Sequence, residues 1–140
     1  MSIINSPLLE QLQTRHGLPL LDADNYDLFV YGNRNVLLFF CNDPSLFPES
    51  NDVAVILPEL LKTFSGQLQA AVISKSIERE LQARFRFTRW PSLVFLQNGD
   101  YLGVITGVHD WQDYRQETAR LLATTPSQPP RFDLDKVCRT

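Results

Sequence analysis

The sequence has few of the residues that build metal sites, disulfide frameworks or redox motifs. Its 140 residues include only two cysteines, Cys41 and Cys138, and two histidines, His16 and His109. The cysteines form no Cys-x-x-Cys pair, and two thiols are too few for a disulfide framework. The histidines have no cysteine or carboxylate partners at metal-ligand spacing. We therefore expect no metal ion and no other cofactor.

Excess positive charge and long hydrophobic runs are lacking as well. The formal net charge is -3, which argues against nucleic-acid binding, because phosphate neutralisation supplies much of that affinity. No run approaches the roughly 18 apolar residues of a membrane span. Residues 1–7 lack the basic start and apolar middle of a secretory signal. These features predict a cytoplasmic protein without membrane insertion.

The composition that is present suits one globular domain. Hydrophobic residues make up 44% and charged residues 21% of the chain, a balance typical of folded proteins. A chain of this length buries one core. Residues 126–140 are rich in proline and poor in apolar side chains. We interpret residues 1–125 as the domain and 126–140 as a flexible tail.

The hydrophobic pattern predicts an α/β fold. Residues 36–41 form a continuous apolar run typical of a central strand buried on both faces. Further strands are predicted at 18–21, where the strand lies at an edge, and at 68–73, 92–97 and 100–106. Helices are predicted from Ser6-Pro7, from Asp24 or Asn25, and from Asn51 or Asp52 to Phe64 with Pro58 inside. Two more helices are predicted to be capped by Ser76 and by Asp110, and the last of them places Trp111 in the core. Asn98-Gly99 predicts a tight hairpin between the last two strands. This order implies a mixed central sheet flanked by helices on both faces.

This arrangement resembles the thioredoxin fold. The stretch from Trp90-Pro91-Ser92 to Asn98-Gly99-Asp100 resembles that fold's cis-proline, strand and glycine turn. Residues 53–64 resemble its long kinked helix. The resemblance implies a cis peptide bond at Pro91. The chain departs from the fold's redox members, because residues 42–52 contain no thiol and disulfide exchange needs an attacking thiolate with a resolving partner.

The whole pattern resembles the HyaE/HupG hydrogenase-expression family. The resemblance rests on Phe39-Phe40, the acidic proline-rich loop at 42–52, Arg89-Trp90-Pro91-Ser92, and Gly107-Val108-His109-Asp110-Trp111. It implies a non-enzymatic chaperone for maturation of a nickel–iron uptake hydrogenase. Its expected partner is the hydrogenase small subunit precursor, whose twin-arginine signal peptide it would bind before export.

Candidate binding residues gather around the proline and the acidic loop. They are Arg89, Trp90, Pro91, Phe40, Asp43, Glu49 and Asp52. In the resembled fold the backbone before the cis-proline pairs with an extended client segment. The carboxylates of the loop would complement the paired arginines of the signal peptide. Each residue also has a structural interpretation: Pro91 as a plain turn, Trp90 and Phe40 as core, and the carboxylates as solvated loop or helix-cap residues.

Two other kinds of function remain open from the sequence. The chain could be an assembly factor that contacts folded hydrogenase subunits or other maturation proteins. It could also be a thiol-redox protein that uses Cys41 or Cys138. Acid–base catalysis by the loop carboxylates lacks an accompanying nucleophile or defined pocket. The signal-peptide chaperone is the leading hypothesis.

Overall fold

The computed structural model describes residues 7–126. The elements are α1 (Pro7–Thr14), β1 (Leu20–Leu21), α2 (Tyr26–Gly32), β2 (Asn35–Phe40), α3 (Glu49–Thr63), β3 (Gln69–Ile73), α4 (Lys75–Phe85), β4 (Ser92–Gln97), β5 (Asp100–Thr106) and α5 (Trp111–Leu122). Cys138, Ser6 and the predicted tail beyond residue 126 lie outside the described residues. The predicted order of strands and helices is confirmed.

The sheet is mixed, in the order β1-β3-β2-β4-β5. Strand β2 lies at its centre, parallel to β3 and antiparallel to β4. The apolar run predicted as a central strand therefore has neighbours on both sides, and α3 makes the crossover that the parallel pair requires. The Asn98-Gly99 turn joins β4 to β5 in the predicted antiparallel hairpin.

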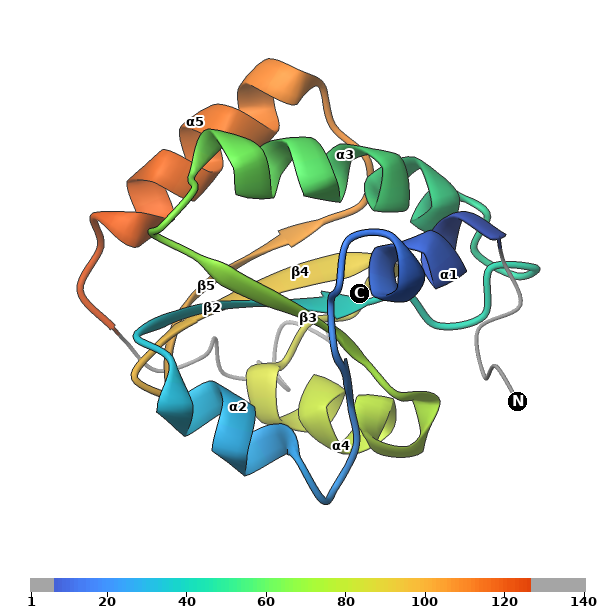
Figure 1. The fold of residues 1–140 in the computed structure, drawn as a ribbon, viewed down its shortest axis with the longest axis horizontal. Coiled ribbons are helices and arrows are strands. Elements are labelled where there is room, and N and C mark those ends of the chain that lie inside the picture. Colours follow the sequence, from blue (N-terminus) through green and yellow to red (C-terminus); the bar gives the residue numbers. More distant parts are fainter. Residues whose placement is uncertain (1–6, 127–140) are drawn as a thin grey trace, which may run out of the picture.

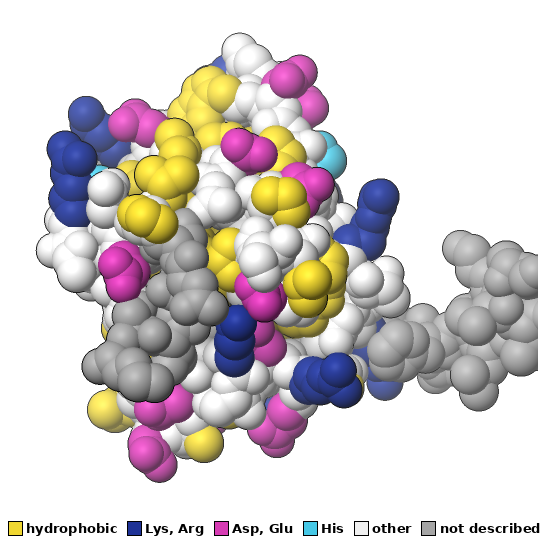
Figure 2. Space-filling view, turned by 90° about the vertical axis from the view of Figure 1, so that its right-hand side faces the viewer, with side chains coloured by type: hydrophobic (Ala, Val, Ile, Leu, Met, Phe, Trp, Pro, Cys, Tyr) yellow, Lys and Arg dark blue, Asp and Glu magenta, His cyan; other side chains and the backbone are white. Residues whose placement is uncertain are grey.

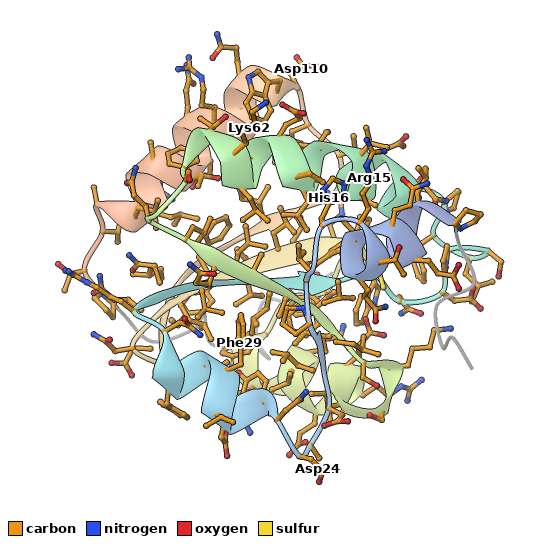
Figure 3. All side chains as sticks on the ribbon, viewed as in Figure 1. Arg15, His16, Asp24, Phe29, Lys62 and Asp110 are labelled. Carbon is orange, nitrogen blue, oxygen red and sulfur yellow. The ribbon has the colours of Figure 1, made fainter. Side chains whose placement is uncertain are left out.

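Helices cover both faces of the sheet, as predicted. Helices α1, α3 and α5 pack on one face and α2 and α4 on the other (Figure 1). The inward side chains of β2 alternate between these layers: Leu37 and Phe39 face α3, whereas Leu38 and Phe40 face α4. Figure 3 shows side chains filling both layers, with Phe29 of α2 directed toward the sheet.

Two helix starts differ from the prediction. Helix α3 begins at Glu49, ahead of the predicted cap at Asn51 or Asp52. The earlier start buries Ser50, whose hydroxyl donates to the carbonyl of Cys41 at 2.6 Å and ties the helix to the end of β2. Helix α4 is capped by Ser74, which accepts from the Ser76 amide, and not by Ser76. The start of α3 is thus set by a contact with β2, whereas the start of α4 is set by a local capping bond.

Trp111 is exposed, and the prediction that it belongs to the core is wrong. Its side chain is 38% exposed. The buried stripe of α5 consists of Tyr114, Thr118 and Leu121. Trp111 shares this helical spacing but is the first residue of the helix, at the outer end marked by Asp110 in Figure 3. Trp111 belongs to neither of the two core clusters that flank the sheet.

Candidate functional site

The backbone around Pro91 leaves one residue unpaired. The Trp90–Pro91 peptide bond is cis, as the resemblance implies. The Pro91 carbonyl accepts from the amide of Gly107 at 2.8 Å, and the Arg89 carbonyl accepts from the Ser92 hydroxyl at 2.6 Å. Within residues 7–126, the amide and carbonyl of Trp90 form no hydrogen bond. Such a group can pair with an added extended segment.

The Trp90 side chain is half-buried within an aromatic cluster. Its ring lies edge-on to Phe87, with ring centroids 5.2 Å apart. The rings of Phe40 and Phe47 lie 6.3 Å and 6.4 Å away. Phe40 is fully buried, so it supports Trp90 and offers no surface of its own. The Pro91 ring is buried too, so of the two residues joined by the cis bond only Trp90 has an accessible side chain.

The loop after β2 stands where redox thioredoxins carry their cysteines. Asn42 has a left-handed φ of 52°, which turns the chain sharply after the strand. Asp43 then closes a local turn, because its carboxylate accepts from the amide and the hydroxyl of Ser45. These hydrogen bonds lower the pKa of Asp43, and the charge of Lys75 lowers it further. The loop is thus a structured acidic turn.

Glu78 is a buried acid that the sequence analysis missed. It lies on α4, is 4% exposed, and accepts a hydrogen bond from the Asn42 amide at 2.9 Å. Burial raises the pKa of Glu78 to about 7, although the Asn42 bond and the charge of Lys75 lower it. One signal was available: Glu78 stands three and seven residues before Leu81 and Phe85, which is the spacing of the buried face of this helix.

A cavity of about 500 Å³ opens between this loop, α4 and Trp90. Its lining residues are Asn42, Lys75, Ser76, Glu78, Arg79, Gln82 and Trp90. The lining combines an aromatic wall with one buried acid and two cations. Such a surface suits a polar or charged side chain of a partner better than an apolar one.

The predicted acidic residues do not form one cluster. Asp43 lies toward α4, with its carboxylate 4.0 Å from the Lys75 ammonium group. Glu49 and Asp52 are exposed on the first turns of α3. Burial raises the pKa of the Tyr114 hydroxyl on α5, and its hydrogen bond with the His109 amide lowers that pKa. The charge of Asp52 also raises the pKa of Tyr114, which requires Asp52 to lie near this residue. Asp52 therefore lies on the α5 side of the sheet, opposite the layer of Trp90.

Three segments meet at the Pro91 end of the sheet, and we call them the cis-proline face: residues 42–48, 89–91 and 107–111. The Phe47–Trp90 contact joins the first two, and the Gly107–Pro91 hydrogen bond joins the last two. Leu46, Val108 and Trp111 of this face are exposed hydrophobic residues. Figure 2 views the side of the molecule that holds the loop after β2, and it shows hydrophobic and acidic side chains interspersed there.

Cys41 is not arranged as a nucleophile. Its side chain is 3% exposed at the end of β2. Burial raises the pKa of the Cys41 thiol to about 12, and the nearby Glu78 charge adds to the shift. A disulfide-exchange cysteine needs the opposite, a stabilised and accessible thiolate. Among residues 7–126, no group of three or more histidine, cysteine or acidic side chains could hold a metal ion.

The thiol chemistry of Cys41 gives a direct prediction. In a Cys138→Ser variant, which leaves Cys41 as the remaining thiol, we expect labelling by a thiol-reactive disulfide at pH 8 about a thousandfold slower than in the urea-unfolded chain. The change in thiolate fraction alone supplies this factor. Native labelling as fast as that of free glutathione, or insulin reduction that Cys41→Ser abolishes, would restore the redox hypothesis.

These features define the class of protein. A mixed sheet, a long helix after the central strand and a cis-proline before β4 constitute a thioredoxin-like fold, here without the paired cysteines. A solved thioredoxin from Plasmodium falciparum has the same fold with a TM-score of 0.59 and 14% identity, covering 76% of this chain and 97% of that one. None of the helices in residues 7–126 has the length and hydrophobicity to cross a membrane.

The chain belongs to the HyaE family. The family model described as hydrogenase-1 expression protein HyaE matches residues 8–114. The hydrogenase expression/formation protein HoxO of Azotobacter vinelandii is 47% identical over 126 residues, which are 90% of this chain and 84% of that protein. A solved hydrogenase expression/formation protein, hupG of Rhodopseudomonas palustris, is 40% identical with a TM-score of 0.54, covering 75% of this chain and 95% of that one. The family supports a role in hydrogenase maturation.

Proposed function

We propose that this protein is a non-enzymatic chaperone that binds the twin-arginine signal peptide of the hydrogenase small subunit precursor before export. The observation that carries the proposal is the unpaired backbone of Trp90 beside its half-exposed ring. An extended client pairs with this backbone by strand addition, and pockets beside it select its side chains. The protein acts in the cytoplasm, where the precursor is made, and needs no cofactor.

The surroundings of Trp90 supply the remaining contacts. A signal peptide carries paired arginines next to an apolar stretch. The exposed Leu46, Val108 and Trp111 of the cis-proline face suit the apolar stretch. Asp43, Glu49 and Asp52 attract the arginines from both sides of the face and give selectivity and fast association more than affinity. Arg89 is exposed beside Trp90 and disfavours a cation directly next to the ring.

Titration calorimetry with a synthetic twin-arginine signal peptide tests this proposal. We expect saturable binding that weakens as salt rises, because exposed charges are screened. A peptide with both arginines replaced by glutamine should bind at least tenfold more weakly. Equal binding of the two peptides would contradict the role of the carboxylates.

Replacing Trp90 by alanine tests the surface itself. We expect Trp90→Ala to weaken peptide binding by about tenfold or more, as for a central aromatic hot spot. Far-ultraviolet circular dichroism should stay native, because the side chain is only half-buried. Leu28→Ala is the matched control, since Leu28 is 80% exposed on α2, outside the cis-proline face. Unchanged binding in Trp90→Ala would mean that the client binds elsewhere.

A signal-deleted small subunit distinguishes the assembly-factor alternative. The proposal predicts that the protein co-purifies with the full precursor but not with the deleted form. Equal recovery of the two forms would favour an assembly factor that recognises folded hydrogenase subunits.

A further inference from the structure

Strand β5 forms an open edge of the sheet. It is the last strand in the order β1-β3-β2-β4-β5, and no strand of residues 7–126 lies beyond it. Its seven residues run from Asp100 to Thr106, whereas the opposite edge strand β1 has only two. An uncovered edge of this length is a template for pairing with another segment.

The hydrogen-bond register identifies which groups of β5 point outward. Gly107 donates to Pro91 across the ladder, and Ile105 pairs with Leu93 two residues earlier. In an antiparallel ladder, alternate residues direct their backbone groups toward the partner and away from it. Val104 and Thr106 therefore direct theirs toward the open side. The Thr106 carbonyl confirms this direction, because it accepts from the His109 imidazole at 2.6 Å.

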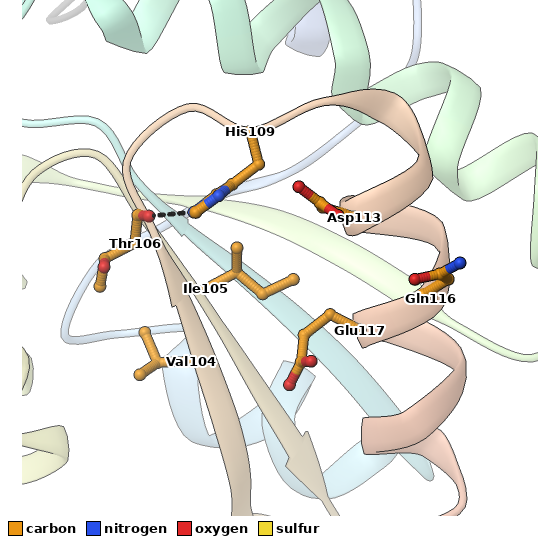
Figure 4. A pocket seen from close by; sticks show the side chains of 7 residues that line it. All are labelled: Val104, Ile105, Thr106, His109, Asp113, Gln116 and Glu117. Carbon is orange, nitrogen blue, oxygen red and sulfur yellow. Dashed lines mark hydrogen bonds between the residues drawn. The ribbon is translucent and has the colours of Figure 1, made fainter.

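A groove runs along this edge. A cavity of about 390 Å³ lies between β5 and α5 (Figure 4). Its lining residues are Val104, Ile105, Thr106, His109, Asp113, Gln116 and Glu117. Figure 4 shows the side chain of Ile105 and the carboxylates of Asp113 and Glu117 in the space between β5 and α5. The groove thus joins outward backbone groups to an acidic wall.

The charges of the groove favour a basic occupant. Glu117 forms an ion pair with Arg120 on the same helix. Asp113 forms no ion pair within residues 7–126. A second copy of the chain paired through β5 would bring two such acidic walls together, and each copy carries a net charge of -3. Repulsion disfavours that dimer, whereas a lysine or arginine of an extended segment neutralises the wall.

We propose that the β5 edge is a second binding surface, which takes an extended basic segment of a partner protein as a sixth strand. The segment pairs with the amide and the carbonyl of Val104 and with the amide of Thr106, whose carbonyl already accepts from His109. Its alternate basic side chains lie against Asp113 and Glu117. This surface adjoins the cis-proline face at His109 but does not include the unpaired Trp90 backbone, and the inference does not rest on the proposed function.

A heptapeptide alternating lysine and valine is the probe. We expect binding in calorimetry and slowed hydrogen exchange of the Val104 and Thr106 amides. Val104→Pro should weaken binding at least tenfold, because it removes an outward donor and none of the bonds to β4. Val104→Thr keeps that donor and should bind normally. Equal binding of a glutamate–valine peptide, or amides that stay unprotected, would overturn the proposal.

Charge reversal gives a second test that does not depend on the fold of the proline variant. Asp113→Lys should weaken binding at least tenfold. Asp24→Lys is the control and should bind normally, because it makes the same charge change on an exposed residue ahead of α2, at the opposite end of the molecule in Figure 3. Trp90→Ala should leave binding unchanged; a loss there would assign the probe to the cis-proline face and overturn the inference. A dimer in sedimentation equilibrium that Val104→Pro dissociates would assign the edge to a second copy and overturn it as well.

Discussion

Replacing Phe40 by alanine is expected to destabilise the protein by about 3–5 kcal/mol, the range for a large aromatic residue removed from a core. Phe40 is fully buried at the end of β2. Its ring lies edge-on to Phe87, with centroids 4.8 Å apart, and supports the ring of Trp90. Truncation leaves a cavity beneath the candidate site. Urea unfolding followed by circular dichroism measures the loss.

Phe40→Leu is the matched variant for this prediction. Leucine keeps most of the buried volume, and we expect a loss of about 1 kcal/mol. The leucine variant should bind a signal peptide nearly as well as the wild type, because Phe40 has no exposed surface. A stable Phe40→Leu protein that no longer binds would show that Phe40 contacts the client directly.

Glu78 is expected to make the protein less stable as the pH rises toward neutrality. Its folded-state pKa is about 7 against an ordinary value of 4.5, chiefly because of burial. Between these values the folded chain holds more protons than the unfolded chain, so the free energy of unfolding falls as the pH rises. The fall ends above about pH 7. Its full size is on the order of 3 kcal/mol.

Glu78→Gln removes this dependence. Glutamine has the same shape, does not ionise, and can still accept the hydrogen bond from the Asn42 amide. We expect the variant to gain stability over the wild type as the pH rises from 5 to 8, with the difference growing to about 3 kcal/mol. Urea unfolding at several pH values measures that difference.

Glu80→Gln is the control for this comparison. Glu80 lies on the same helix but is exposed, and its pair with Arg84 is a surface ion pair of little energetic weight. Its difference from the wild type should stay nearly constant across the same pH range. Parallel curves for the wild type and Glu78→Gln would mean that the Glu78 carboxylate is solvated, contrary to the structure.

The strongest sequence signals were local, and the structure agrees with them. The apolar run at residues 36–41 predicted a central strand buried on both faces, and β2 (Asn35–Phe40) is that strand. The Asn98-Gly99 pair permits the tight turn between two strands. The Trp90-Pro91 signature identified the cis bond through the resemblance to a known fold.

The weaker predictions depended on where elements end against one another. Trp111 has the helical spacing of a buried residue, yet it is exposed and packs in neither core cluster. The cap of α3 was placed too late, because the bond from Ser50 to Cys41 lies between elements. Periodicity describes one element at a time and contains no information about how far its neighbour extends.

By itself the sequence determined the α/β architecture, the family and the absence of a thiol from residues 42–52, because each depends on residue types in a fixed local order. Only the tertiary structure decided that Glu78 is buried against the Asn42 amide, that Asp43 and Asp52 lie on different sides of the sheet, and that β5 has an open acidic edge. These properties belong to pairs of distant segments. Their burial and charge arise only when packing brings those segments together.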